Sequence, residues 1–214
     1  MQTNGLMSKL NSILSWVTKM AYLNGLWLLF SIIGFVVIGF FPATVAMMTI
    51  CRKWLNGESE FKLFPTFLSI YKAELLSANL LGWMFSSIGI VLYFNYLVLQ
   101  ASPDVNIVMV AAFYVIVFLY VLTSTHFLPI YVHYHVSLFT CLKNAFIMGL
   151  VNVHISIAIV ISQSAFYYLM FTYPAGALFF LGSVLSIIQM WLAFRSFNRI
   201  EKKSATLSTN KILI

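Results

Sequence analysis

The chain has 214 residues, of which 62% are hydrophobic and 8% are charged, and its formal net charge is +7. A soluble globular domain carries about a quarter charged residues, so this composition excludes a chain whose whole surface faces water. The cations stand in short segments beside apolar stretches, which is the pattern of a membrane protein, and we therefore expect no nucleic-acid partner.

Charged residues are absent from four long blocks, which lie between Lys19 and Arg52, Glu74 and Asp104, Asp104 and Lys143, and Lys143 and Arg195. A helix needs about 20 apolar residues to cross a bilayer, and the last block has room for two helices around Tyr173-Pro174. We predict an all-α fold, a polytopic membrane helix bundle in one transmembrane domain, 1–204, followed by a cytoplasmic tail, 205–214. The five transmembrane helices are expected near residues 20–41, 76–100, 105–128, 145–171 and 175–195.

Residues 5–19 have mixed polarity and form the first predicted helix. It either lies in the membrane interface as an amphipathic helix or extends the first span outward.

A proline interrupts the first apolar block at Pro42. Because proline disfavours a helical residue before it and suits the first turn of a helix, the first span should end at Phe41. A second, interfacial helix is then expected over 42–56, with Ala43, Met47, Ile50 and Trp54 on its apolar face. A comparable break at Leu128-Pro129 predicts a third interfacial helix over 130–143, and the similarity of the two breaks leaves a degenerate internal repeat open.

The cations divide unequally between the two sides of the predicted bundle. Ten fall between spans one and two, between spans three and four, or after span five, whereas Lys9 and Lys19 fall on the other side. Because positive loops stay in the cytoplasm, this predicts an N-terminus outside and a C-terminus in the cytoplasm. Cys51 and Cys141 have no CxxC partner, and we interpret them as small apolar residues.

One stretch of the chain resembles the YesL-like family of small bacterial integral membrane proteins, which carry a domain of unknown function. The residues that carry the resemblance are Phe41, Pro42, Ala43, Thr44, Ala46, Arg52, Lys53, Trp54, Gly57, Phe67, Tyr71, Lys72 and 77–82, including Asn79 and Gly82. The segment Pro129–Gly149 is also similar to the family's second cytoplasmic segment. The resemblance implies a protein of the bacterial cytoplasmic membrane, often encoded beside carbohydrate-uptake and polysaccharide-degradation systems, and it implies no established activity.

Several polar side chains fall inside the predicted spans. They are Asn79, Asn95, Asn152, His154, Ser156, Gln163 and Gln189. Such groups either line a polar passage or hold helices together by hydrogen bonds, and the absence of an acidic residue from every predicted span favours the second interpretation. His126, His133 and His135 are placed at or beyond the end of span three, so we expect them at the interface and predict no metal site.

The sequence offers little for catalysis, since none of its five acidic residues pairs with a histidine at helical spacing and it contains no phosphate-binding, dinucleotide or hydrolase motif. We expect no enzyme and no cofactor. The predicted function is a non-enzymatic accessory or assembly factor linked to carbohydrate uptake or utilisation, or to the cell envelope. The alternative is a small transporter or channel with a polar path around His154, Asn79 and Gln163.

The expected partners follow from the cations between spans one and two. Arg52, Lys53, Lys62 and Lys72 predict contact with anionic lipid of the bilayer, and the same surface suits a transporter, another membrane protein or a second copy of the chain.

Overall fold

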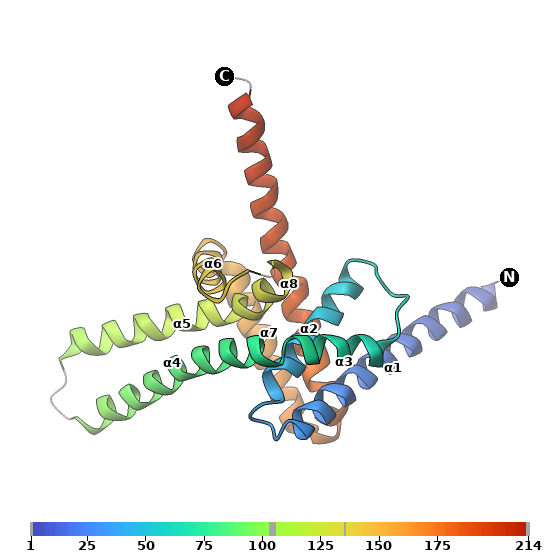
Figure 1. The fold of residues 1–214 in the computed structure, drawn as a ribbon, viewed down its shortest axis with the longest axis horizontal. Coiled ribbons are helices and arrows are strands. Elements are labelled where there is room, and N and C mark those ends of the chain that lie inside the picture. The colour runs from blue at the N-terminus through green and yellow to red at the C-terminus, as the bar shows by residue number, and fades with distance from the viewer. Residues whose placement is uncertain (1, 103–105, 135, 213–214) are drawn as a thin grey trace. The chain divides into compact units, whose positions relative to one another are not determined.

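The computed structural model describes residues 2–102, 106–134 and 136–212, with side chains described for 7–102, 106–134, 136–197 and Arg199. Over these ranges the chain forms eight helices and no strand, which confirms the predicted all-α fold (Figure 1). The helices are α1 (Gln2–Ile33), α2 (Phe40–Leu55), α3 (Leu63–Ala73), α4 (Leu75–Ala101), α5 (Ile107–Tyr134), α6 (Leu138–Val151), α7 (Val153–Thr172) and α8 (Pro174–Ile212).

Five helices in the described part of the chain are long and apolar enough to cross a membrane, as predicted. Their apolar segments are Met7–Ile33, Leu75–Ala101, Ile107–Tyr134, Val153–Thr172 and Pro174–Phe197. Lipid offers the backbone no hydrogen-bond partner, so each apolar block closes its own backbone bonds as a helix.

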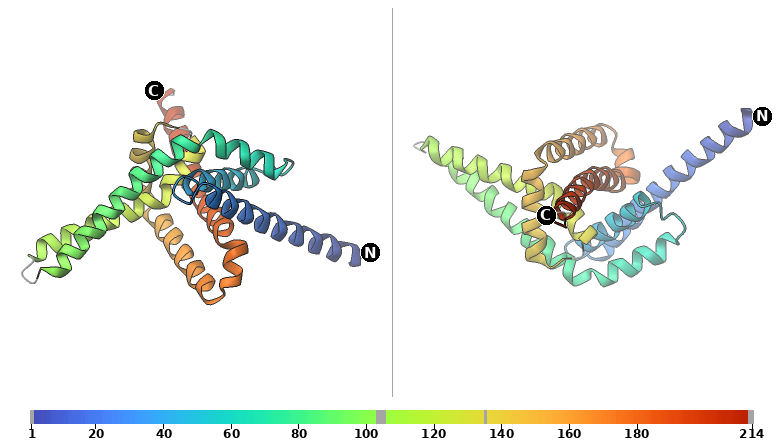
Figure 2. Two further views of the ribbon diagram at one scale, coloured as in Figure 1. Left: turned by 60° about the horizontal axis from the view of Figure 1, so that its bottom comes forward. Right: turned by 90° about the horizontal axis from the view of Figure 1, so that it is seen from above.

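The helices form two compact units. The first unit contains the chain up to Leu76 together with Gln163–Ile188, and the second contains Ser77–Ser162 and the chain from Gln189 onward. In the second unit α4 and α5 form a hairpin and run side by side in all the views (Figure 2). Stacking of the Phe85 ring on Tyr120 and Phe127, with ring centroids 4.7 and 4.5 Å apart, joins the two helices.

The break after the first span lies earlier than the proline predicts. Residues 5–19 and the first span are one helix, α1, which ends at Ile33, and a turn over 34–39 leads into α2. Gly34 and Gly39 approach so closely that a Cβ on Gly34 would meet the Cα of Gly39, and Phe35 and Val36 take left-handed φ angles of 54° and 62°. Pro42 lies in the first turn of α2, where a missing N–H leaves no helix bond unmade.

The predicted end of span three at residue 128 is wrong, since α5 continues through Pro129 to Tyr134. Proline removes the N–H that would bond to the carbonyl four residues earlier, which is that of Thr125. The side-chain Nε2 of Gln189, from α8, donates to that Thr125 oxygen at 2.9 Å and replaces the lost bond. The predicted interfacial helix 130–143 is therefore divided between the end of α5 and the start of α6.

Two further boundaries differ from the prediction. The expected span 145–171 is divided at Asn152, whose φ and ψ of −118° and 45° end α6 before α7 begins. The helix expected over 175–195 is the first part of α8, which continues to Ile212 without a separate tail at 205.

Candidate functional site

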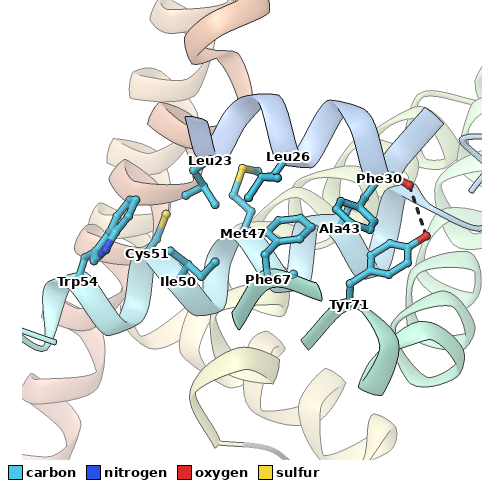
Figure 3. Close-up of a cluster of buried hydrophobic side chains, with 11 residues drawn as sticks. Leu23, Leu26, Phe30, Ala43, Met47, Ile50, Cys51, Trp54, Phe67 and Tyr71 are labelled. Carbon is cyan, nitrogen blue, oxygen red and sulfur yellow. Dashed lines mark hydrogen bonds between the residues drawn. The ribbon is translucent and has the colours of Figure 1, made fainter. Parts of the chain in front are cut away.

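Several family-motif residues of the first unit lie in its hydrophobic core. Side chains from α1, α2 and α3 meet in one buried cluster, drawn in Figure 3: Leu23, Leu26, Phe30, Ala43, Ala46, Met47, Ile50, Cys51, Trp54, Phe67 and Tyr71. The predicted apolar face of α2 is part of this cluster. Thr49, from the opposite face, is buried as well and donates to the carbonyl of Val45 at 2.8 Å.

Polar atoms of the motif close the ends of these helices. The Tyr71 hydroxyl donates to the carbonyl of Phe30 near the C-terminal end of α1, at 3.4 Å (Figure 3). The indole N–H of Trp27 donates to the Thr44 hydroxyl at 3.0 Å. Burial raises the pKa of the Tyr71 hydroxyl, so it stays protonated and able to donate. These contacts assign this part of the motif to packing and helix closure.

Of the predicted cations, Lys53 in the last turn of α2 and Lys62 lie at the α2–α3 loop (residues 56–62), whereas Lys72 lies in the last turn of α3. Lys53 pairs with Glu58 through Nζ and Oε2, 2.9 Å apart, and its Nζ lies 5.6 Å from the centroid of the Phe61 ring. The chain turns at Gly57, whose φ of 87° favours glycine. A hollow of about 410 Å³ lies here and is bordered by Lys53, Gly57, Glu58, Ser59, Glu60 and Phe61. This surface is of mixed charge, because carboxylates stand beside the predicted cations.

Asn24, fully buried in α1, joins α1 to α8 in the first unit. Its Nδ2 donates to the Leu178 carbonyl at 2.6 Å, and its Oδ1 accepts from the backbone N–H groups of Gly182 and Ser183 at 2.8 and 3.1 Å. Leu178 and Gly182 are four residues apart, so their carbonyl and N–H are the acceptor and the donor of one helical hydrogen bond. The Asn24 amide bonds to both groups. The absence of a Cβ on Gly182 permits this approach. A Cβ at this position would stand 3.1 Å from the Asn24 oxygen, which is closer than an ordinary van der Waals contact.

His126 forms the polar centre of the second unit. The ring is fully buried, and its Nε2 lies 2.9 Å from the hydroxyl of Ser156 on α7. That hydroxyl also contacts the carbonyls of Gly149, in the last turn of α6, and of Asn152, at the α6–α7 break, both at 3.4 Å. Asn152, a predicted candidate, is buried and forms the break itself.

The polar path predicted around His154 is not assembled on α7. His154 is exposed and accepts a hydrogen bond from Arg199, with Nε2 and Nη1 3.1 Å apart. Gln163 is nine residues further along α7, an offset that turns it to the opposite face and roughly 13 Å along the axis. Asn95 is exposed, and its amide donates to Val91 of its own helix at 2.8 Å.

Asn95 also borders a groove between α4 and α5. The groove has a volume of about 820 Å³, and Asn95, Ser102 and Asn106 are polar residues in a lining that is otherwise largely apolar. Of the remaining candidates, Asn79 is half-buried, Gly82 is buried, and His135 and Asp104 lie outside the described residues.

The described side chains contain no group of three or more histidine, cysteine or acidic residues able to hold a metal ion. Cys51 and Cys141 are buried, and burial raises both thiol pKa values, that of Cys141 to about 12. Neither thiol is a reactive thiolate at neutral pH.

Sequence reasoning did not identify the hydrogen-bond partners of three buried groups, Asn24, His126 and Gln189. His126 was expected at the interface, but α5 extends eight residues beyond it, roughly 12 Å, which leaves the ring inside the unit. A signal for Gln189 was available in principle, since a proline within a span requires a donor for the carbonyl that it frees.

Long apolar helices, with buried amides bonded to backbone groups of neighbouring helices, define a multi-pass α-helical membrane protein. A family model described as "Protein of unknown function, DUF624" matches residues 20–96. The chain is 32% identical to the uncharacterized protein YesV of Bacillus subtilis (strain 168) over 86% of this chain and 89% of YesV. The chain therefore belongs to the YesL-like DUF624 family, as its motifs indicated.

Two further relatives come from the same organism. The uncharacterized protein YesL is 29% identical over 91% of this chain and 92% of its own length. The uncharacterized protein YteU is 25% identical over 94% of this chain and 91% of its own length. No solved structure matches the chain.

Proposed function

We propose that the protein is a non-enzymatic accessory or assembly factor of the bacterial cytoplasmic membrane. It binds another integral membrane protein of a carbohydrate-uptake or cell-envelope system. The observation that carries this proposal is that the buried amides and the His126 ring form hydrogen bonds within the fold. Asn24 bonds to the backbone of α8, Gln189 replaces the bond lost at Pro129, and His126 contacts Ser156 beside the α6–α7 break, so these groups hold the fold together.

The family context supports the choice of system. Members that share the Phe41–Trp54 motif are often encoded beside carbohydrate-uptake and polysaccharide-degradation systems, as the resemblance implies.

The α2–α3 loop is the proposed docking surface. Its side chains are exposed from Asn56 to Glu60, and they present carboxylates and a lysine around the hollow at Gly57. Such a polar, mixed-charge surface on a rigid helical core suits a polar loop of a partner protein.

Site-specific photo-crosslinking in cells tests the proposal. A photoreactive residue at Ser59 should capture a specific membrane protein, whereas Trp54 is an unsuitable position because its ring is 6% exposed. The matched control is Tyr168, which is 77% exposed on the apolar helix α7. A Ser59 probe that captures no protein beyond those captured from Tyr168 contradicts the proposal.

The alternative, a small transporter or channel, has less support. His154 and Gln163 lie on opposite faces of α7, and His154 is engaged by Arg199. A flux assay in proteoliposomes separates the two functions: flux that His154→Ala abolishes favours the transporter.

We further propose that the N-terminus lies outside and the C-terminus in the cytoplasm, which the ten-to-two division of cations supports. Cysteine labelling tests this orientation with little background, because both native cysteines are buried. A membrane-impermeant maleimide should label Asn11→Cys in intact cells and Ser59→Cys only after permeabilisation. The reverse pattern overturns the orientation.

A further inference from the structure

The last apolar turns of α8 carry two arginines in the second unit. The guanidinium carbon of Arg195 lies 3.8 Å from the centroid of the Trp191 ring, a close cation–π contact. Arg199 donates through Nη1 to Nε2 of His154, 3.1 Å away. A guanidinium has no acceptor, so His154 must present a free lone pair, and Arg199 keeps four further N–H donors.

The three α8 side chains form a single stripe. Trp191, Arg195 and Arg199 are spaced by four residues, which places them on one face with roughly 6 Å of helix between neighbours. The charge-free block of the sequence ends at Arg195, so the stripe begins in the apolar part of α8 and continues into its charged part. Side chains at this spacing are neighbours on the helix surface.

Aromatic packing holds the opposite face of α8 against α5. The His133 ring lies 5.2 Å from Phe194 and 4.8 Å from Phe197, measured between centroids, and Phe197 is fully buried. Trp191 is 46% exposed, and Arg195 and Arg199 are exposed as well. Because the face of α8 with Phe194 and Phe197 packs against α5, the face with Trp191, Arg195 and Arg199 is exposed.

No carboxylate occurs among the described side chains of the second unit. Its sequence contains only Asp104 and Glu201 as acidic residues, and both side chains lie outside the described ones. Among the described residues, the interaction of Arg195 is the cation–π contact with the Trp191 ring. No described carboxylate of the second unit offsets the charge of the two arginines.

We propose that Arg195, Arg199 and Trp191 bind the headgroup phosphate of an anionic phospholipid. The guanidinium fork matches the geometry of phosphate oxygens, and the indole occupies the interfacial depth where tryptophan is enriched. The stripe begins where the apolar part of α8 gives way to charged residues, which favours a lipid over a soluble phosphate, because the acyl chains of a lipid bound there would lie along the apolar part. The site is independent of the proposed docking loop.

Native mass spectrometry of the full-length protein in detergent tests the site, with titrations of phosphatidylglycerol and phosphatidylcholine. Phosphatidylglycerol should bind more tightly. Each arginine contributes about fivefold, from about 1 kcal/mol per cation, so Arg195→Gln with Arg199→Gln should weaken it about 30-fold. Binding of phosphatidylcholine should change less than about twofold.

Two matched variants complete the design. Lys9→Gln with Lys143→Gln removes the same charge from exposed positions outside the stripe and should leave binding within about twofold. Arg195→Lys with Arg199→Lys keeps the charge but not the planar fork, and it should bind with intermediate affinity.

Three results overturn the proposal. One is an equal loss in the lysine control, which would mean diffuse attraction to net charge. Another is equal affinity for the two lipids in the unaltered chain. The third is displacement of the lipid by millimolar glycerol 3-phosphate, which would assign the stripe to a soluble anion.

Discussion

The hydrogen bond from Gln189 to Thr125 should stabilise the second unit because Pro129 lies in α5. Gln189→Met keeps an unbranched side chain of similar length and removes the donor. In the unaltered protein the Thr125 carbonyl lies 2.9 Å from the Gln189 amide nitrogen. In the variant this buried carbonyl would lose that donor. A buried unsatisfied polar group costs about 1–3 kcal/mol. Hydrogen bonds between membrane helices contribute about 0.6 kcal/mol to stability on average and at most about 1.7 kcal/mol. We expect a loss of about 1–2 kcal/mol in the free energy of unfolding.

A double-mutant cycle with Pro129→Ala isolates this effect. Alanine restores the backbone N–H that bonds to the Thr125 carbonyl, so the amide of Gln189 becomes dispensable. Gln189→Met should therefore cost less than half as much in the Pro129→Ala background, which is a coupling of about 1 kcal/mol. Equal costs in both backgrounds would refute the role of Gln189 in replacing the proline's lost bond.

Equilibrium unfolding in dodecylmaltoside with increasing SDS, followed by far-UV circular dichroism, measures these differences. Gln100→Met is the matched control, since Gln100 is exposed on α4 and its Nε2 donates to the Tyr96 hydroxyl at 2.6 Å. Loss of a surface hydrogen bond should change stability by less than about 0.5 kcal/mol.

Three further outcomes are expected. Asn24→Leu removes three hydrogen bonds between α1 and α8 and should cost about 2–3 kcal/mol in the same unfolding assay, whereas a cost near zero would mean that the backbone of α8 closes without the amide. Gly182→Ala should cost about 1–2 kcal/mol, because its Cβ would stand 3.0 to 3.1 Å from three neighbouring side-chain atoms, and a stabilising effect would contradict that crowding. The native thiols of Cys51 and Cys141 should react with maleimide at pH 7.5 only after SDS denaturation, and rapid labelling of the folded protein would contradict their burial. Because the thiol pKa of Cys141 rises from 9.0 to about 12 on folding, the unfolded chain loses this proton first, so unfolding titrations should show stability falling between about pH 9 and 12.

The residues next to a position predicted the wrong local structure where a side chain distant in the sequence supplied a hydrogen bond. Pro129 predicted a helix end because a proline normally leaves a carbonyl unpaired, yet Gln189, which follows it by about 60 residues, supplies the missing donor and α5 continues. The same continuation changes the environment of His126 from interface to interior. The break between α1 and α2 comes earlier than Pro42 predicts, because Gly34 and Gly39 form a close backbone contact. The hydrophobicity of the sequence gives no sign of this contact.

The motif around Pro42 illustrates how family membership and function differ. Its residue types and their spacing are enough to indicate the family, and Ala43, Ala46 and Trp54 lie in the buried cluster of α1, α2 and α3. A motif that encodes core packing marks ancestry and fold, but it carries no chemistry of its own.

The sequence by itself determined the class of protein and, over the described residues, the number of helices long and apolar enough to cross a membrane. Each apolar block must satisfy its own backbone in lipid, and a helix does so with local bonds that depend only on block length and composition. Only the tertiary structure decided what the polar side chains do. The partners of Asn24, Gln189, His126 and Arg199 are 30 to 159 residues away in the chain, and no local pattern specifies bonds over such distances.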